Sequence, residues 1–142
     1  GWMLIATLIM QPVRMLRQGI DDLRAIDKQL TELRKVTGES LDVMNEYAHI
    51  ANEVASRMGA TTEEVIRQTT AWSRLGYNIQ EASKLAEESV LLSTVGNMDI
   101  DKATTSLVSI LKAFRIEADD ARIAIDMINE VGKCLPSMLV IA

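Results

Sequence analysis

The feature that most constrains this chain is the spacing of its apolar residues, which recur at every third or fourth position along most of its length. No stretch keeps the strict alternation of apolar and polar residues that a half-buried strand shows. In the segment 100–114, for example, the recurring apolar residues are Ile100, Ala103, Leu107, Ile110 and Phe114. Such spacing gathers apolar side chains on one face of a helix. The sequence therefore predicts an all-α protein.

Stop and start signals divide the chain into helices. Glycine ends helices because it accepts a left-handed backbone, and glycines stand near the ends of the periodic segments, at Gly38, Gly59, Gly76, Gly96 and Gly132. Start signals follow several of these glycines. Thr61 with Glu64, and Asn78 with Glu81, have the spacing of capping boxes. Ser40 and Asp99 are expected as single N-caps.

These signals predict six helices, at about 13–36, 40–58, 62–75, 79–94, 100–114 and 118–131. The short connections favour antiparallel neighbours. The expected architecture is a compact bundle of about five short helices preceded by one longer amphipathic, coiled-coil-like helix. Residues 1–36 form the apolar N-terminus and this helix, 37–132 the bundle, and 133–142 an apolar tail. The glycine stops are 21, 17, 20 and 36 residues apart, which indicates no sequence repeat of a solenoid.

Particular side chains in the bundle also have expected places. In the segment 40–58 the stripe expected to be buried contains Leu41, Met44, Ala48, Ala51, Ala55 and Met58. Met127 is likewise expected in the core. Trp72 and Tyr77 flank Gly76 and are expected to fix the turn around it.

The first helix has a nearly heptad-spaced apolar seam, which we call the first-helix seam. It contains Val13, Leu16, Ile20, Leu23, Ile26, Leu30, Leu33 and Val36. A seam of this kind pairs helices between chains, although its steps drift from a strict heptad. Two arrangements stay open: the helix projects and pairs with copies of itself, or it folds back on its own bundle. For the first arrangement the expected oligomer contacts are Leu16, Ile20, Leu23, Leu30 and Leu33.

Composition excludes several kinds of site. The net charge is −5, with +2 in residues 1–36 and −7 in residues 37–142, which argues against nucleic-acid binding through phosphate contacts. One cysteine, Cys134, cannot form an intramolecular disulfide. One histidine, His49, leaves a zinc cluster short of ligands, and it is expected to be half-buried in packing. No catalytic, cofactor-binding or metal-binding residues are predicted, and the chain is not expected to be an enzyme.

Both ends of the chain are apolar. The run from Trp2 to Met10 is shorter than the roughly 20 residues that a membrane-spanning helix needs, and no basic residue precedes it as in a signal peptide. The ends are expected to pack on protein, with contact to lipid or to a partner chain as the alternative.

Residues 30–131 carry a series of short stretches in a recognisable order. They run from Leu33 to Gly38 (LRKVTG), Ala55 to Thr62 (ASRMGATT), Ala71 to Ala82 (AWSRLGYNIQEA), Asp101 to Thr104 (DKAT) and Ile125 to Val131 (IDMINEV). In order and spacing they resemble the N-proximal core domain of phage tail tape measure proteins from long-tailed phages and prophages of Gram-positive bacteria. The resemblance ends at Lys133, where an apolar tail replaces the polar helical sequence of the family.

The resemblance implies a non-enzymatic structural protein of a phage tail. Family members lie in the tail lumen, set tail length, and help the genome enter the host. The implied partners are further copies of the chain, tail-tube subunits and assembly chaperones, with host membrane contact at infection and no sequence-specific nucleic acid. The implied location is the virion tail lumen, and the host cytoplasm during assembly. Because family members are several times longer, the chain is expected to be a fragment or truncated form.

Two other functions remain open from the residues alone. The apolar ends and Trp2 suit a membrane-active helical protein, such as a pore former or a lysis factor, although no polar helix face is rich in Lys or Arg. A soluble helical adaptor that binds one protein partner would show the same composition.

Overall fold

The computed structural model describes residues 22–127 and Glu130, and every regular element in this part of the chain is helical. A first helix covers residues 22–37. It is followed by α2 (Leu41–Met58), α3 (Thr62–Arg74), α4 (Ile79–Gly96) and α5 (Ile100–Phe114). A 3-10 turn, η1 (Ala118–Asp120), then leads into a last helix over residues 121–127. The predicted all-α bundle is confirmed. The predicted apolar ends, including residues 1–21 and 131–142, lie outside the described residues.

The predicted helix starts are confirmed by hydrogen bonds. The side chain of Thr61 accepts from the backbone N–H of Glu64, and the carboxylate of Glu64 accepts from the backbone N–H of Thr61, at 3.2 and 3.0 Å. Asn78 and Glu81 form the same reciprocal pair. Ser40 caps α2, and Asp99 caps α5. These bonds satisfy backbone donors that have no partner inside the helix, so each start is fixed locally.

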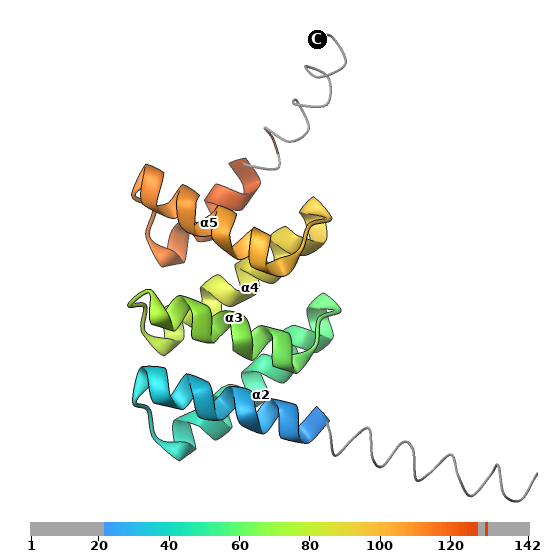
Figure 1. The fold of residues 1–142 in the computed structure, drawn as a ribbon. Coiled ribbons are helices and arrows are strands. Elements are labelled where there is room, and N and C mark those ends of the chain that lie inside the picture. Colours follow the sequence, from blue (N-terminus) through green and yellow to red (C-terminus); the bar gives the residue numbers. More distant parts are fainter. Residues whose placement is uncertain (1–21, 128–129, 131–142) are drawn as a thin grey trace, which may run out of the picture.

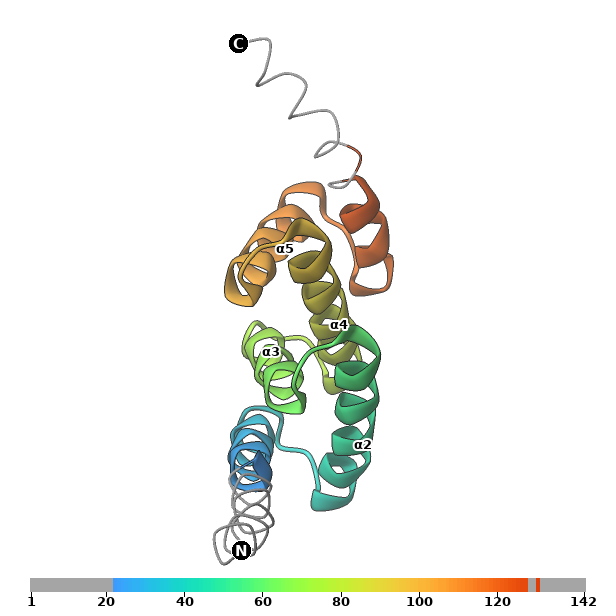
Figure 2. The same cartoon turned by 90° about the vertical axis from the view of Figure 1, so that its right-hand side faces the viewer.

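The helices alternate between two layers. Helix 22–37, α3 and α5 lie in one layer, while α2, α4 and the last helix lie in the other (Figure 1, Figure 2). Each consecutive pair is a helical hairpin, and the three hairpins stack on one another. As a result the first and last hairpins form the two ends of the stack.

The backbone repeats along this stack although the sequence shows no repeat. The turn inside each hairpin has a left-handed residue: Gly38 (φ 72°), Gly76 (φ 102°) and Arg115 (φ 53°). These residues are separated by 38 and then 39 positions. The turns between hairpins also have left-handed residues, Gly59 and Asn97, again 38 apart. The glycine positions alone do not show this repeat, because asparagine and arginine stand at two of the five turn positions that glycine would mark.

Two hydrophobic clusters hold the stack together. One contains Leu33 of the first helix with Met44 and Tyr47 of α2 and Ile66 of α3. The other joins α3, α4, α5, η1 and the last helix around Trp72 and Leu85. Helices α3 and α4 each contribute to both clusters, because their buried residues lie on more than one face. The hairpin of α3 and α4 is therefore the centre of the fold.

Several side chains are more exposed than their periodic positions predicted. Leu41 is 60% exposed in the first turn of α2, and Phe114 is 68% exposed in the last turn of α5. A periodic stripe runs the length of a helix, but burial requires a neighbouring helix at that height. Met127, expected in the core, is 54% exposed. His49 is exposed rather than half-buried.

Candidate interaction surfaces

A groove of about 410 Å³ lies between α2 and α4 in the second layer. Val43, Ile50 and Ile79 supply apolar lining, and Glu46 and Lys84 supply charged groups. Val43 and Ile50 are seven residues apart, which places them on the same face of α2. A groove with an apolar lining and charged groups suits the apolar face of a partner helix.

Tyr47 closes the inner side of this groove. Its hydroxyl donates a 2.6 Å hydrogen bond to Oγ1 of Thr69, and the ring is buried. Burial raises the pKa of the Tyr47 hydroxyl well above its ordinary value, because the phenolate would lose its hydration there. Tyr47 therefore stays neutral at any physiological pH and serves packing.

Ion pairs tie the helices of the second layer together. Arg57 of α2 pairs with Glu87 of α4 at 2.6 Å. Lys84 of α4 reaches Asp119 at 2.5 Å, and its pKa is raised by this hydrogen bond. Arg122 of the last helix pairs with Glu88 of α4 at 2.8 Å, which raises the pKa of the guanidinium. Because these groups are partly solvated, the pairs add little to the free energy of folding. Their main effect is to align neighbouring helices with one another.

A buried polar link crosses between α3 and α5 on the other layer. The Gln68 amide donates to a carboxylate oxygen of Asp101 at 3.0 Å and accepts from the Thr104 hydroxyl at 2.6 Å. Gln68 is buried, so both ends of its amide need partners. The link fixes how α5 lies on α3, and no sequence pattern indicated it because its members are 33 and 36 residues apart.

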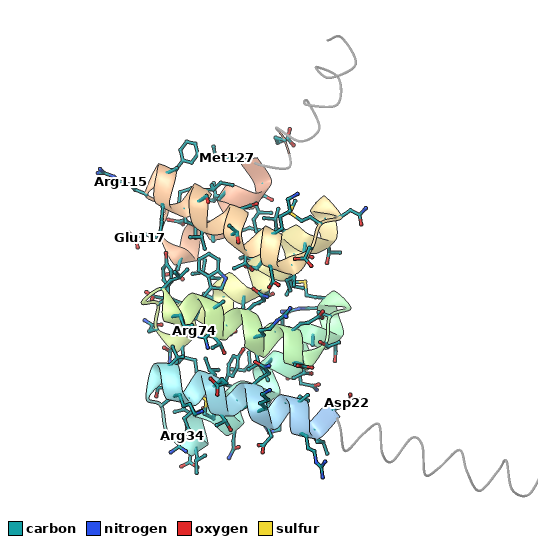
Figure 3. The ribbon with its side chains drawn as sticks, in the orientation of Figure 1. Asp22, Arg34, Arg74, Arg115, Glu117 and Met127 are labelled. Carbon is teal, nitrogen blue, oxygen red and sulfur yellow. The ribbon has the colours of Figure 1, made fainter. Side chains whose placement is uncertain are left out.

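The second exposed apolar face belongs to the last helix. Ile123, Asp126, Met127 and Glu130 line a hollow there. Ile123 is 56% exposed, while Ala121, Ala124 and Ile125 on the opposite side of the helix are buried. Figure 3 shows Met127 at one end of the stack and Arg34 at the other. This face is therefore an end surface of the molecule.

The predicted oligomer contacts of the first helix differ in how far they are buried. Leu33 is completely buried in the core between the first helix, α2 and α3, and Leu30 packs against the same core. Leu33 therefore packs inside its own chain and has no surface left for a partner, so the prediction that Leu33 is an oligomer contact is wrong. Leu23 is 67% exposed, and Leu16 and Ile20 lie outside the described residues. The C-terminal half of the first helix folds back on its own bundle.

Three surface carboxylates, those of Glu87, Glu88 and Asp119, form ion pairs between helices. Asp119 pairs with Lys84, and Glu87 and Glu88 pair with separate arginines. Across residues 22–127 and Glu130, no group of three His, Cys, Asp or Glu side chains is placed to hold a metal ion. In the same range no helix is long and apolar enough to cross a membrane.

These features define an all-helical protein built of stacked hairpins, with an apolar groove between α2 and α4 and an exposed apolar face at one end of the stack. The family model of phage-related minor tail proteins matches residues 51–134, which is more than half of the chain. The chain belongs to this family. The match includes the stretches from Ala55 to Val131 that carry the resemblance to tape measure proteins, whereas the host group stays a prediction. No solved structure matches the chain.

Proposed function

We propose that this protein is a non-enzymatic structural component of a phage tail, of the tape measure type. The observation that carries the proposal is the match of residues 51–134 to phage-related minor tail proteins. The order of the stretches resembling tape measure proteins supports the finer assignment. In this role the protein lies in the tail lumen, contacts tail-tube subunits and assembly chaperones, and meets the host membrane when the genome leaves.

A stack of hairpins adds much less length per residue than a continuous helix does. A continuous helix advances about 1.5 Å per residue, so one 38-residue repeat would span roughly 57 Å if extended. Stacked helices lie about 8–10 Å apart, so the same repeat adds only about 10 Å along the stack. We therefore assign the folded stack an anchoring role in the tail, and the ruler itself to continuous helical sequence in the longer proteins of this type.

The test uses the phage or prophage gene that encodes this domain, with two in-frame duplications of equal length. One duplicates the repeat 62–99 inside the stack, and the other duplicates 38 residues of continuous helical sequence outside it. Electron microscopy of purified tails measures their length. We expect the second duplication to lengthen tails by roughly 57 Å and the first by about 10 Å or less. If neither changes tail length and purified tails lack the protein, the tail assignment is wrong.

The groove between α2 and α4 favours one other candidate, a helical adaptor that binds a single protein partner. An adaptor would be absent from purified tails and would bind a discrete partner through Val43 and Ile50. Mass spectrometry of purified tails separates the two functions, because a tail component remains with the particle.

A further inference from the structure

The repeat shows which face of the last helix is left without a neighbour. In α4, Lys84 and Glu88 contact the following hairpin through Asp119 and Arg122. Ile123 and Met127 stand 39 residues after Lys84 and Glu88, which is the spacing of the second repeat step. They occupy the equivalent positions of the last helix and point to where a fourth hairpin would lie. At this place the described chain has two exposed apolar side chains instead of a contact.

The opposite end of the stack has a different surface. The first helix buries Ile26, Leu30 and Leu33 against the bundle. Its other face carries a stripe of exposed residues, which we call the basic stripe, made of Arg24, Lys28, Thr31 and Lys35, of which Lys35 is paired with Glu32 of the same helix at 2.9 Å. These residues follow one another by four, three and four positions, so they align along the helix. A polar outer face is the usual end of a helical stack, and this one is positively charged.

The last helix presents an acidic and apolar surface at this end of the stack, which we call the end stripe. It contains Ile123, Asp126, Met127 and Glu130, which line one hollow, whereas Asp119 of η1 is paired with Lys84 of α4. Residues 115–130 hold five acidic and two basic side chains, whereas residues 22–37 hold four basic and three acidic ones. The two ends of the molecule are therefore complementary in charge.

We propose that a second copy of this chain docks head to tail, with its basic stripe on the end stripe of the first copy. The aliphatic parts of Arg24 and Lys28 would cover Ile123 and Met127 while their charged ends reach Asp126. The contact uses different surfaces on the two copies, so it does not close into a dimer. It leads to a line of copies that continues the two-layer stack. This inference is independent of the assignment to a tail.

The test is the absolute mass of the full chain by light scattering over a range of concentrations. We expect the mean mass to rise above 15.7 kDa with concentration, without a plateau at two copies, and to fall as salt is added. Arg24→Glu with Lys28→Glu, and separately Asp126→Lys, should each raise the concentration of half-association by about tenfold or more, since 1.4 kcal/mol corresponds to tenfold. Glu53→Lys, an exposed change of equal charge on α2, is the matched control and should leave the curve unchanged.

The decisive variant combines Arg24→Glu, Lys28→Glu and Asp126→Lys in one chain, because the reversed charges are again complementary and should restore association. Circular dichroism confirms that each variant is folded. Three results would overturn the proposal. They are a wild-type chain that stays at 15.7 kDa, a plateau at two copies that Leu23→Asp abolishes, and a Glu53→Lys effect as large as that of Asp126→Lys. The second result would instead assign association to the first-helix seam.

Discussion

The indole N–H of Trp72 in α3 donates a 3.0 Å hydrogen bond to Oγ of Ser89 in α4, inside the larger hydrophobic cluster. The Ser89 hydroxyl in turn donates to the carbonyl oxygen of Leu85 at 2.9 Å. Both side chains are fully buried, so the indole has no access to water. Trp72 also meets the ring of Tyr77 edge to face, with centroids 5.6 Å apart, so the two residues contact each other across the turn around Gly76.

Replacing Ser89 with alanine should lower the free energy of unfolding by about 1–3 kcal/mol, because the buried indole N–H loses its acceptor. Urea denaturation measures the change. In Trp72→Phe the donor is absent, so Ser89→Ala should have a smaller effect there. Equal effects of Ser89→Ala in the two backgrounds would show that the hydrogen bond contributes nothing.

Gly76 and Arg115 occupy equivalent turns of two hairpins, and substitutions there should change the stability of the protein in opposite directions. Gly76 has φ of 102°, so Gly76→Ala should destabilise the protein by about 1–2 kcal/mol, although no atom lies within 4 Å of the added Cβ. Arg115 has φ of 53°, so Arg115→Gly should stabilise it by about 0.5–1 kcal/mol.

Thermal unfolding of both variants is the measurement for these turns. Ala113→Gly, which lies inside α5 where glycine is unfavourable, is the control and should destabilise by about 1 kcal/mol. Stabilisation by Gly76→Ala would contradict the left-handed turn.

Removing the cap of α3 by Thr61→Ala should cost about 1 kcal/mol, because the backbone N–H of Glu64 loses its acceptor. Thr105→Ala is the matched control, since the exposed Thr105 hydroxyl bonds only the carbonyl of Asp101 in its own helix. Chemical denaturation should show a clear loss for the first variant and little change for the second. Equal losses would mean that the capping box does not set the start of α3.

Stability at high pH should depend on Tyr47. Burial raises the pKa of its hydroxyl in the folded state, so the folded protein holds the proton more tightly than the unfolded chain. The resulting stability is complete below the ordinary pKa of about 10 and declines as pH rises above it. In Tyr47→Phe this part of the decline should disappear, whereas Tyr77→Phe should retain it. Urea midpoints between pH 8 and 11 give the comparison.

The helices and their boundaries follow from local sequence signals. The capping pairs Thr61 with Glu64 and Asn78 with Glu81, and the left-handed glycines at 38, 59 and 76, act within one turn of the backbone, so their effect is readable from neighbouring residues. The buried faces were predictable for the same reason wherever a neighbouring helix covers the whole stripe. Leu41 and Phe114 are exposed because no neighbouring helix covers the stripe at their positions.

What each helix packs against became clear only from the folded chain. It placed Leu33 in its own core rather than at a seam between chains, joined Gln68 to Asp101 and Thr104, and set the three hairpins in one repeating stack. It also left Ile123 and Met127 exposed at one end. These outcomes depend on contacts between residues of different helices, 11 to 36 positions apart in the examples given, and on the repeat distance between helices. Local periodicity, which reports one helix at a time, carries no information about either.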